Sequence, residues 1–416
     1  MIQKTKALFL HLVRASVILF LLMPINSQAF ETAKTLPQGV RNLNIRTVNT
    51  QIESKTDGSG NALPLAEPLK QDLTFEKIAH GDSPIKAKQL KAFLLINGFN
   101  EGQSVGTFAA DLNGSLNVTA PIFAYGWTDD FSIAIAVPYY QAATSINVGF
   151  KANSTGQEFL NSLASPQNNQ AGLAHEAGIK LNNAVSELNV QLDENGYGKL
   201  EDWQDSGIGD ITLATKQRLI NRPAFALATA NGLVLPTGRV DDLDLLQDIG
   251  FGDGQTDFFS QWIFEQTLPS KINFAQHAKY TVQLPDSKNV RYVEEDEVIA
   301  VRSGVTRFKL GDKIDAGLSM TWTPDSGFVS GIGYNYFKKF GDIYRELPEY
   351  SKLILERDTV QTSHVAEFGI GYSTLPAYLR GDFAAPFEVK LSYLKQLRSA
   401  NLPVTDLAQF DMNLFF

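Results

Sequence analysis

The residues best suited to chemistry in this sequence are its histidines, and their spacing forms neither a catalytic nor a metal site. Beyond residue 30 they are His80, His175, His277 and His364, which are scattered and match no H-E-x-x-H pattern. No G-x-S-x-G elbow is present. A predicted strand, not a helix, follows Gly207-Ile208-Gly209-Asp210, so this segment does not match a phosphate loop. We expect no enzyme activity, metal or cofactor, with a hydrolase pair assembled from different strands as an alternative.

A second set of polar residues alternates with apolar ones, which is the spacing of a strand with one wet face. In a membrane barrel that face lines the lumen. The predicted lumen-lining residues are Asp210, Lys216, Arg218, Glu265, His277, Lys279, Arg302, Glu367 and Lys390. They carry both signs, so a pore lined by them would have no strong ion preference, which favours an uncharged solute. The alternative is that these side chains only hydrate and brace the interior.

Five aspartates lie close together in one segment, at Asp241, Asp242, Asp244, Asp248 and Asp253. Carboxylate oxygens are ligands for divalent cations, but this spacing matches no calcium-binding loop. We therefore interpret the segment as a solvated acidic loop.

The strands that must position the polar residues are clearest at the end of the chain. Between Leu407 and Phe416, apolar side chains alternate with Gln409, Asp411 and Asn413. An apolar face against lipid and a polar face on the lumen are typical of a transmembrane β-barrel. Similar alternation, strongest from Thr107 to Ile122, predicts thirteen strands, but a barrel with both ends in the periplasm needs an even number. Loop lengths place the missing strand near Asn289 to Asp296.

We therefore predict an all-β fold, a transmembrane antiparallel up-and-down β-barrel of about 14 strands, with twelve as the alternative count. Helical insertions are expected in long outer loops. A soluble secreted β-sandwich is the main alternative fold.

Residues 1–29 have the features of a secretory signal peptide. Basic residues precede a short apolar core, Ala15 to Met23, and Ser27-Gln28-Ala29 is a small-residue cleavage site. This core is about half of the ~20 residues that a membrane anchor needs. The net charge of −9 argues against a nucleic-acid partner. The sequence contains no cysteine. This is compatible with export, because an exported chain with a large fold does not need disulfides.

Several segments depart from the strand pattern. We assign residues 30–104 to a periplasmic lead (Glu31 to Gln38), a first strand and a helical insertion, and residues 105–416 to the barrel, with long loops at 151–206 and 341–359. Asp82-Ser83-Pro84 predicts the start of a helix from Ile85 to Ile96, which would be either a plug or a cap. Because barrels have short periplasmic turns and long outer loops, we place residues 151–206 outside the cell.

Three short motifs resemble a known family. Tyr125-Gly126-Trp127-Thr128-Asp129, Gly207-Ile208-Gly209-Asp210-Ile211-Thr212-Leu213 and Leu235-Pro236-Thr237-Gly238 are similar to segments of the outer-membrane proteins of phenol meta-pathway degradation. That family is a group of transporters related to the long-chain fatty-acid channel. The resemblance covers the barrel from about Val105 to Phe416. It implies a channel that passes small hydrophobic molecules, and it brings no catalytic residues.

The leading hypothesis is a monomeric barrel in the outer membrane that acts as a passive channel for small, apolar or aromatic molecules. One alternative is a structural or adhesive barrel acting through its surface loops, and another is a barrel hydrolase. The expected partners are outer-membrane lipid, lipopolysaccharide and the solute, together with the assembly machinery, which would recognise the terminal strand ending in Phe416. No nucleic acid is expected.

Overall fold

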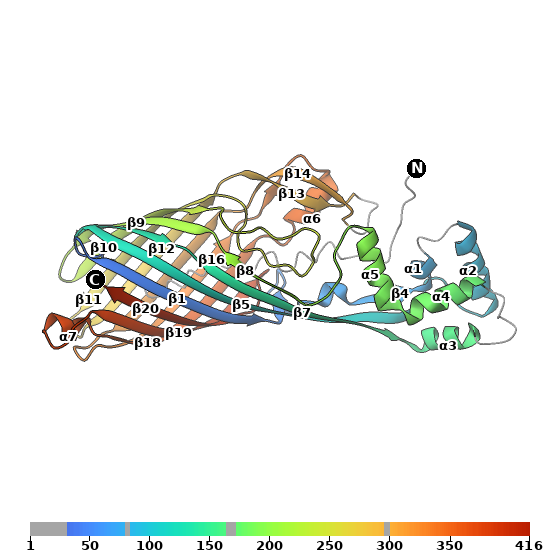
Figure 1. Ribbon diagram of the computed structural model, residues 1–416, viewed down its shortest axis with the longest axis horizontal. Helices are drawn as coiled ribbons and strands as arrows, with labels where there is room; N and C mark the ends of the chain where they lie inside the picture. The colour runs from blue at the N-terminus through green and yellow to red at the C-terminus, as the bar shows by residue number, and fades with distance from the viewer. Residues whose placement is uncertain (1–30, 80–83, 164–171, 295–299) are drawn as a thin grey trace.

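The protein is a closed antiparallel β-barrel, seen from the side in Figure 1. A computed structural model describes residues 31–79, 84–163, 172–294 and 300–416. Twelve strands form the ring, and β1 pairs with both β5 and β20 to close it. In ring order they are β1 (Arg41–Ile52), β5 (Ser104–Thr128), β6 (Phe131–Ala136), β9 (Ile211–Asn221), β10 (Phe225–Leu235), β11 (Asp257–Leu268), β12 (Ile272–Gln283), β15 (Lys313–Trp322), β16 (Phe328–Lys339), β18 (Gln361–Ser373), β19 (Phe387–Ala400) and β20 (Asp406–Phe415).

The barrel therefore has twelve strands, which confirms the alternative count and not the favoured one. A strand does exist near Asn289 to Asp296, as β13 (Asp286–Tyr292), but it pairs with β14 (Arg302–Lys309) in a separate sheet with β17 (Ile343–Tyr344). This small sheet and the neighbouring α6 (Glu349–Glu356) have their own core, which includes Val290 and Phe308. Both strands alternate because they cover that core.

A long hairpin carries β5 beyond the ring (Figure 1). The first half of β5 pairs with β4 (Gln71–Thr74) and β7 (Tyr139–Ala152), and β7 pairs with β8 (Trp203–Ile208). We call these strands, with the helices attached to them, the arm. The helices are α1 (Phe75–Ala79), α2 (Pro84–Ile96), α3 (Ser154–Leu163), α4 (Gly172–Asn182) and α5 (Ala184–Glu194). The remaining short elements between β1 and β4 are β2 (Ser54–Thr56), β3 (Ala62–Pro64) and η2 (Glu67–Leu69).

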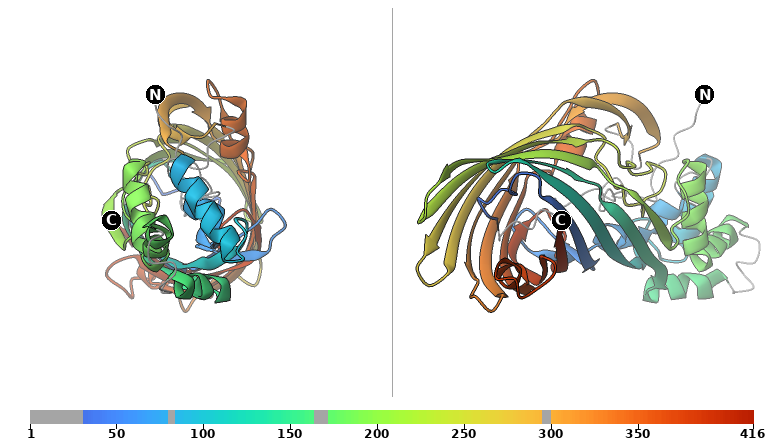
Figure 2. Two further views of the ribbon diagram at one scale, coloured as in Figure 1. Left: turned by 90° about the vertical axis from the view of Figure 1, so that its right-hand side faces the viewer. Right: turned by 60° about the vertical axis from the view of Figure 1, so that its left-hand side comes forward.

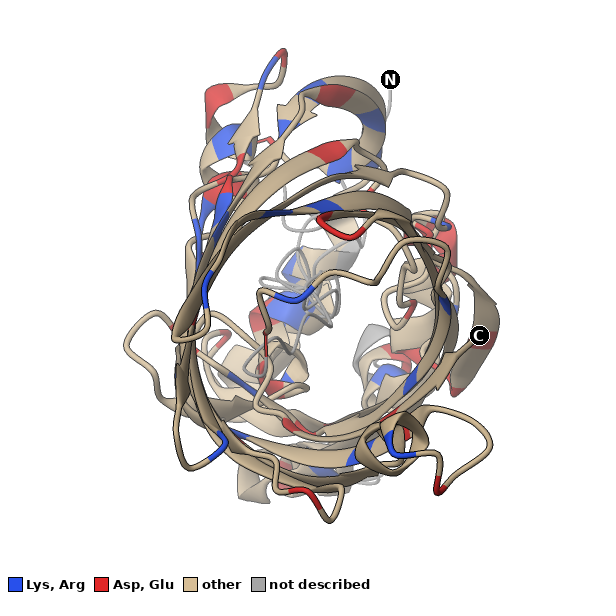
Figure 3. Cartoon of the chain, turned by 90° about the vertical axis from the view of Figure 1, so that its left-hand side faces the viewer, with Lys and Arg blue, Asp and Glu red and all other residues tan. Residues whose placement is uncertain are grey.

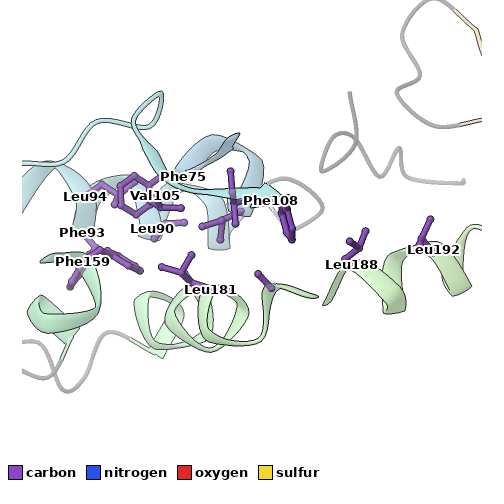
Figure 4. Packing of buried hydrophobic residues seen from close by; sticks show 14 of the residues in the cluster. Phe75, Leu90, Phe93, Leu94, Val105, Phe108, Phe159, Leu181, Leu188 and Leu192 are labelled. Atoms are coloured by element: carbon purple, nitrogen blue, oxygen red, sulfur yellow. The ribbon is translucent and has the colours of Figure 1, made fainter. Parts of the chain in front are cut away.

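The helices of the arm pack on one another around an apolar core (Figure 4). The Phe159 ring meets Phe75 and Phe93 edge-on, with ring centroids 4.9 Å and 6.0 Å apart. α2 covers the range in which the sequence predicts a helix, and it lies beyond the end of the barrel (Figures 1 and 2). None of the helices among the described residues is long and apolar enough to cross a membrane.

The two ends of the barrel differ in the length of their connections. At one end Arg41 and Phe416 exchange backbone hydrogen bonds and most turns are short, the longest containing α7 (Leu375–Leu379). The arm, the β13–β14 sheet and α6 all lie at the other end (Figure 1). Membrane barrels have short periplasmic turns and long outer loops. We therefore identify the end with the arm as the outer end.

The apolar face of the wall changes sides along β5. Near the periplasmic end, Phe123 points outward and is 43% exposed. Closer to the outer end, Leu112, Leu116 and Val118 are buried on the inside, whereas Asp111, Asn113 and Ser115 are exposed on the outside. The strong alternation in this part of the sequence therefore covers an internal core and not a lipid face.

The neighbouring strand β1 changes in the same way and at the same height. Its Asn42 and Asn44 face inward near the periplasmic end, whereas Val48 and Ile52 do so near the outer end. The change occurs where Thr47 of β1 pairs with Thr119 of β5. A wall that is apolar outside suits lipid, and a wall that is polar outside suits water. The pairing of Thr47 with Thr119 thus marks the outer boundary of the lipid-facing band on this side. We call the apolar interior between this pairing and the outer end, which includes Ile52, Leu112 and Leu116, the vestibule.

Candidate functional site in the barrel lumen

Most of the predicted lumen-lining residues lie on the inner wall. Glu265 on β11, His277 and Lys279 on β12, and Glu367 on β18 are buried there. Lys216 on β9 is also on this wall, because its amine donates to the Thr32 carbonyl inside the barrel.

Two predicted lumen residues lie off the inner wall, and a third, Arg218, lies on it at the periplasmic rim, in register with the inward-facing Ala228. Arg302 is on β14, outside the barrel, where its guanidinium lies 2.6 Å from a Glu294 carboxylate oxygen. Arg218 is at the periplasmic end, 2.7 Å from the carboxylate of Asp130 in the turn between β5 and β6. Asp210 lies between β8 and β9 at the outer end.

Opposite charges alternate across neighbouring strands of the inner wall. Glu367 on β18 lies 4.0 Å from Lys390 on β19. Lys390 is in register with Asp411 on β20, and Asp411 lies 2.7 Å from Arg46 on β1. Buried charges are costly unless each has a partner. Because each charge here lies beside one of opposite sign, this wall offers little net charge to attract an ion.

Residues Thr32 to Gln38, for which the sequence predicts a periplasmic lead, instead bond to the inner wall and to the β5–β6 turn, and we call them the lumen segment. Glu265 accepts hydrogen bonds from the Thr32 hydroxyl at 2.6 Å and the Ala33 N–H at 2.7 Å. The Leu36 N–H donates to the Ser132 hydroxyl at 3.0 Å. Viewed along the barrel from the periplasmic end, this part of the chain crosses the opening (Figure 3). The segment narrows the lumen at that end.

Small side chains make room for the lumen segment. Ala33 is fully buried against Ala228 on β10 and Ile263 on β11. Ala226, Ala230 and Gly232 also belong to the inward face of β10, which therefore carries no large side chain near the segment. The sequence pattern does not predict the lumen segment, and the all-small inward face of β10 is the one signal for it in the sequence. A strand that leaves its inner space unfilled indicates that another part of the chain fills it.

The connection between β10 and β11, residues 236–256, folds back into the outer end of the barrel, and we call it the lid loop. Its Ile249 and Phe251 are buried in the vestibule with Leu112, Leu116 and Tyr140. The rings of Phe251 and Tyr140 stack, with centroids 5.5 Å apart and planes 15° apart. The prediction of a solvated loop is therefore wrong for this part of the segment, because its apolar residues anchor it inside the barrel.

An arginine within the lid loop holds its acidic residues in place. Arg239 donates to both carboxylate oxygens of the buried Asp248, at 2.6 Å and 2.8 Å, and lies 3.0 Å from Asp205. Its guanidinium also lies over the Phe251 ring, 4.9 Å from the centroid. The hydrogen bond to Asp248 is the largest of the effects that raise the pKa of Arg239. In the described residues no group of three or more His, Cys, Asp or Glu is placed to hold a metal ion.

A second arginine joins the lid loop to the arm and the β13–β14 sheet. Arg291 bonds to the Asp244 carboxylate, with its Nε 2.9 Å from the carboxylate oxygen. It also donates to the carbonyl oxygens of Asn195 and Ala300, at 3.2 Å and 3.1 Å. Its guanidinium lies 4.0 Å from the centre of the Tyr197 ring. Arg291, which lies on β13, therefore connects the lid loop, the arm and the β13–β14 sheet at the outer end of the barrel.

Two of the motifs that carry the family resemblance meet at the base of the lid loop. The Thr237 hydroxyl donates to the Gly209 carbonyl and accepts from the Ile211 N–H, both at 2.9 Å. Asp210 accepts from the Gly238 N–H at 2.9 Å and the Asp253 N–H at 3.4 Å. A Cβ at Gly209 would lie 2.2 Å from the Tyr140 ring, which explains the glycine. Burial raises the pKa of Asp210 to about 6, and the nearby Asp253 carboxylate acts in the same direction.

Comparison with solved structures agrees with this fold. The match to the crystal structure of an outer-membrane channel from Pseudomonas putida F1 covers 92% of this chain and 98% of the channel's chain, with a TM-score of 0.52 and 11% identity. A Pseudomonas aeruginosa FadL homologue matches 93% of this chain and 93% of its own, with a TM-score of 0.34 and 8% identity. The Pseudomonas putida toluene transporter TodX matches 91% and 89%, with a TM-score of 0.32 and 12% identity. The last two scores are too low to support an argument.

Sequence comparison gives the family. No curated protein matches the chain. The model of the family described as "Putative MetA-pathway of phenol degradation" matches residues 97–374, which include both motifs at the base of the lid loop and most of the barrel strands. This chain belongs to that family.

Proposed function

We propose that this protein is a passive channel of the outer membrane that takes up small hydrophobic molecules, including aromatic ones. The observation that carries the proposal is the reversed polarity of β1 and β5 above the lipid-facing band. Leu112 and Leu116 line the inside there, while Asp111 and Ser115 face water. An open aqueous pore would need a polar lining at its mouth, whereas an apolar interior favours molecules that leave water readily.

Two further observations support the same class of function. The family description names phenol degradation, and the similar Pseudomonas putida F1 protein is an outer-membrane channel. The lumen segment and the lid loop narrow the barrel at its two ends, which would limit leakage of ions and sugars. The polar side chains of the lower lumen would then hydrate and brace the wall.

The outer-membrane location has its own physical support. Outward residues such as Trp262 and Phe410 are 52% and 43% exposed, while their neighbours Gln261 and Gln409 are buried on the inside. Water would oppose the exposure of so many large apolar groups, and lipid would not. We infer that lipid, lipopolysaccharide and, through the strand ending in Phe416, the assembly machinery are partners of a monomeric barrel. We propose no catalytic role for it.

The test is the entry of an apolar dye into intact Gram-negative cells, since their lipopolysaccharide slows such dyes. Cells that produce the protein should take up 1-N-phenylnaphthylamine faster than cells with an empty vector. Leu116→Asn, which makes the vestibule polar, should slow entry, whereas Ser115→Asn on the water-facing side of the same strand should not. Equal rates with and without the protein would refute the proposal.

A second candidate function, adhesion through the arm, has one observation in its favour. At the far end of the arm, Ile85, Leu95 and Ile96 of α2 are 71%, 76% and 82% exposed. An exposed apolar patch is a common feature of binding surfaces. Shortening the arm should abolish cell-surface binding and leave dye uptake intact if adhesion is its role. Loss of uptake with no change in surface binding would contradict this view.

A further inference from the structure

Basic side chains cross three neighbouring strands on the outside of the barrel, near its outer end. Along β16 the even-numbered side chains face outward, as the 50% exposure of Ile332 shows, so Tyr336 and Lys338 face outward as well. Tyr336 is in register with His364 on β18, and His364 is in register with the exposed Arg398 on β19. We call Lys338, His364 and Arg398 the basic row.

Aromatic side chains hold the basic row in place. The Tyr334 hydroxyl lies 2.5 Å from Nδ1 of His364, and the centroid of the Tyr336 ring lies 5.1 Å from that of the imidazole. The amine of Lys338 lies over the Phe340 ring, 5.0 Å from its centroid. Tyrosines gather where a membrane meets water. The basic row therefore lies at the outer edge of the lipid-facing band on this side of the barrel.

The two permanent charges of the row have no acidic partner in the described parts of the chain, since neither Lys338 nor Arg398 forms an ion pair there. At the periplasmic end, by contrast, the exposed Lys271 and Arg380 are each paired with an aspartate. The protein is acidic overall, with a net charge of −9. Two such cations at one edge of the lipid-facing band indicate an anionic partner at that edge.

The basic row is a local feature and not a belt around the barrel. On β5, the exposed side chains beyond the outer boundary of the lipid-facing band are Asp111, Asn113 and Ser115, which are acidic or uncharged. A lipid with an anionic head group would therefore be attracted to β16, β18 and β19 and not to β5.

An apolar groove of about 520 Å³ lies on the same strands, closer to the periplasmic end. Phe368 in its wall follows His364 by four residues on β18, which places the groove about 13 Å along the strand from the basic row. Gly331 and Gly369 are in register beside it and leave space between the larger side chains. The other apolar lining residues include Ile332, Ile370 and Leu391. Such a groove suits an acyl chain whose head group lies at the basic row.

The spacing of the cations fits a head group with more than one phosphate. Lys338 and Arg398 are two strands apart, which is about 10 Å at the usual distance between strands. Ammonium and guanidinium groups are the usual protein partners of phosphate. The lipid part of lipopolysaccharide is an acylated disaccharide that carries phosphate groups, so one molecule can contact both cations. A phospholipid has a single phosphate and cannot.

We propose that the basic row binds the phosphorylated head group of one lipopolysaccharide molecule, with an acyl chain of that molecule in the groove. The inference rests on the lipopolysaccharide partner of the proposed function and assigns that partner a site on the barrel.

The test measures binding of fluorescently labelled lipopolysaccharide to the purified full-length protein in detergent. Lys338→Gln and Arg398→Gln should each weaken binding about fivefold, which is the contribution of one cation near an anionic lipid surface. The double variant should weaken it roughly 25-fold. The matched control removes two exposed cations elsewhere, by Lys88→Gln on α2 and Lys151→Gln on β7, and should leave binding unchanged. Heat-modifiable gel mobility shows that each variant folds, and the single variants carry the test if the double one does not.

Three other probes separate the sources of phosphate. Dephosphorylated lipopolysaccharide should bind the wild type about as weakly as the intact lipid binds the double variant. Phosphatidylglycerol should compete poorly, and inorganic phosphate should not displace the labelled lipid. Wild-type binding by the double variant, an equal loss in the control, or full competition by either of the last two probes would overturn the inference.

The uptake proposal is tested separately by the entry of the apolar dye. If the dye enters and the double variant binds lipopolysaccharide like the wild type, only the lipid site fails. If the lipid binds as expected and the dye does not enter, only the uptake function fails.

Discussion

Replacing Glu265 by alanine should release the start of the lumen segment. Its carboxylate accepts hydrogen bonds from Thr32 and from the N–H of Ala33, and Glu265 itself is 4% exposed. A hydrogen bond to a charged group contributes about 1.5–3 kcal/mol, so the two together contribute about 3–6 kcal/mol to the closed position. At about 1.4 kcal/mol per factor of ten, the released population should rise by roughly 10²- to 10⁴-fold.

The release should be partial, because the rest of the segment has its own anchors. Leu36 bonds to Ser132, and the Gln38 N–H donates to Asp129 at 2.9 Å. We therefore expect residues near Thr32 and Ala33 to leave the wall while those near Gln38 stay. In planar lipid bilayers, Glu265→Ala should show longer and larger ion-conducting openings than the wild type.

Two controls separate this effect from general damage to the barrel. Glu265→Gln keeps an acceptor oxygen and should give an intermediate conductance. Gln276→Ala, on the outward face of β12, should leave the conductance unchanged. If Glu265→Ala folds, as judged by heat-modifiable gel mobility, and conducts like the wild type, then the lumen segment does not close the periplasmic end.

Three further predictions follow from the same structure. Leu391→Arg, on the lipid face, should lower the free energy of unfolding by about 2–4 kcal/mol in urea titrations. Asn113→Arg, on the outer side of the lipid-facing band, should change it by less than about 0.5 kcal/mol. Equal losses would contradict the assigned membrane position. Phe75→Ala removes a fully buried ring from the arm core and should cost about 3–5 kcal/mol, making the arm protease-sensitive while the barrel keeps its heat-modifiable mobility. Asp210 has a folded pKa of about 6, above its unfolded value near 4, so its contribution to lid closure is complete below about pH 4 and is lost as the pH rises through 6. Dye uptake should therefore increase across that range, and Asp210→Asn, which cannot ionise beside Asp253 and Asp257, should give a flat profile.

The barrel strands could be predicted because lipid on one side and the lumen on the other give each strand one apolar and one polar face. Trp262 faces out and Gln261 faces in, and the same period of two recurs at Phe410 and Gln409. The strand count was not predictable in the same way. β13 and β14 also alternate, but they cover Phe308 and a small core outside the barrel. Alternation indicates that a strand has two unlike faces and does not identify what covers the apolar one.

The lumen segment closes the periplasmic end and the lid loop closes the outer end. The sequence did not predict these two closures, because the residues that hold them are distant in sequence. Ala33 bonds to Glu265, which lies 232 residues away, and no local pattern encodes such a contact. For the lid loop, five aspartates suggested solvation, whereas the apolar residues between them decide where the loop lies. Ile249 and Phe251 find their apolar partners on β5 and β7, and Arg239 neutralises Asp248 within the loop itself.

The two closures should respond to different molecules, because different interactions hold them. An apolar ligand can replace Phe251 on the vestibule wall with little loss of buried apolar area, but it cannot replace the hydrogen bonds that Glu265 makes to the lumen segment. An apolar solute should therefore open the outer closure and leave the periplasmic one shut. Among the described contacts, the bonds of Glu265 share no partner with those of Arg239, so their effects should add. Glu265→Ala should raise ion conductance without changing the rate of dye uptake, and Arg239→Ala should do the reverse. A change in both properties from either substitution alone would mean that the two closures are coupled.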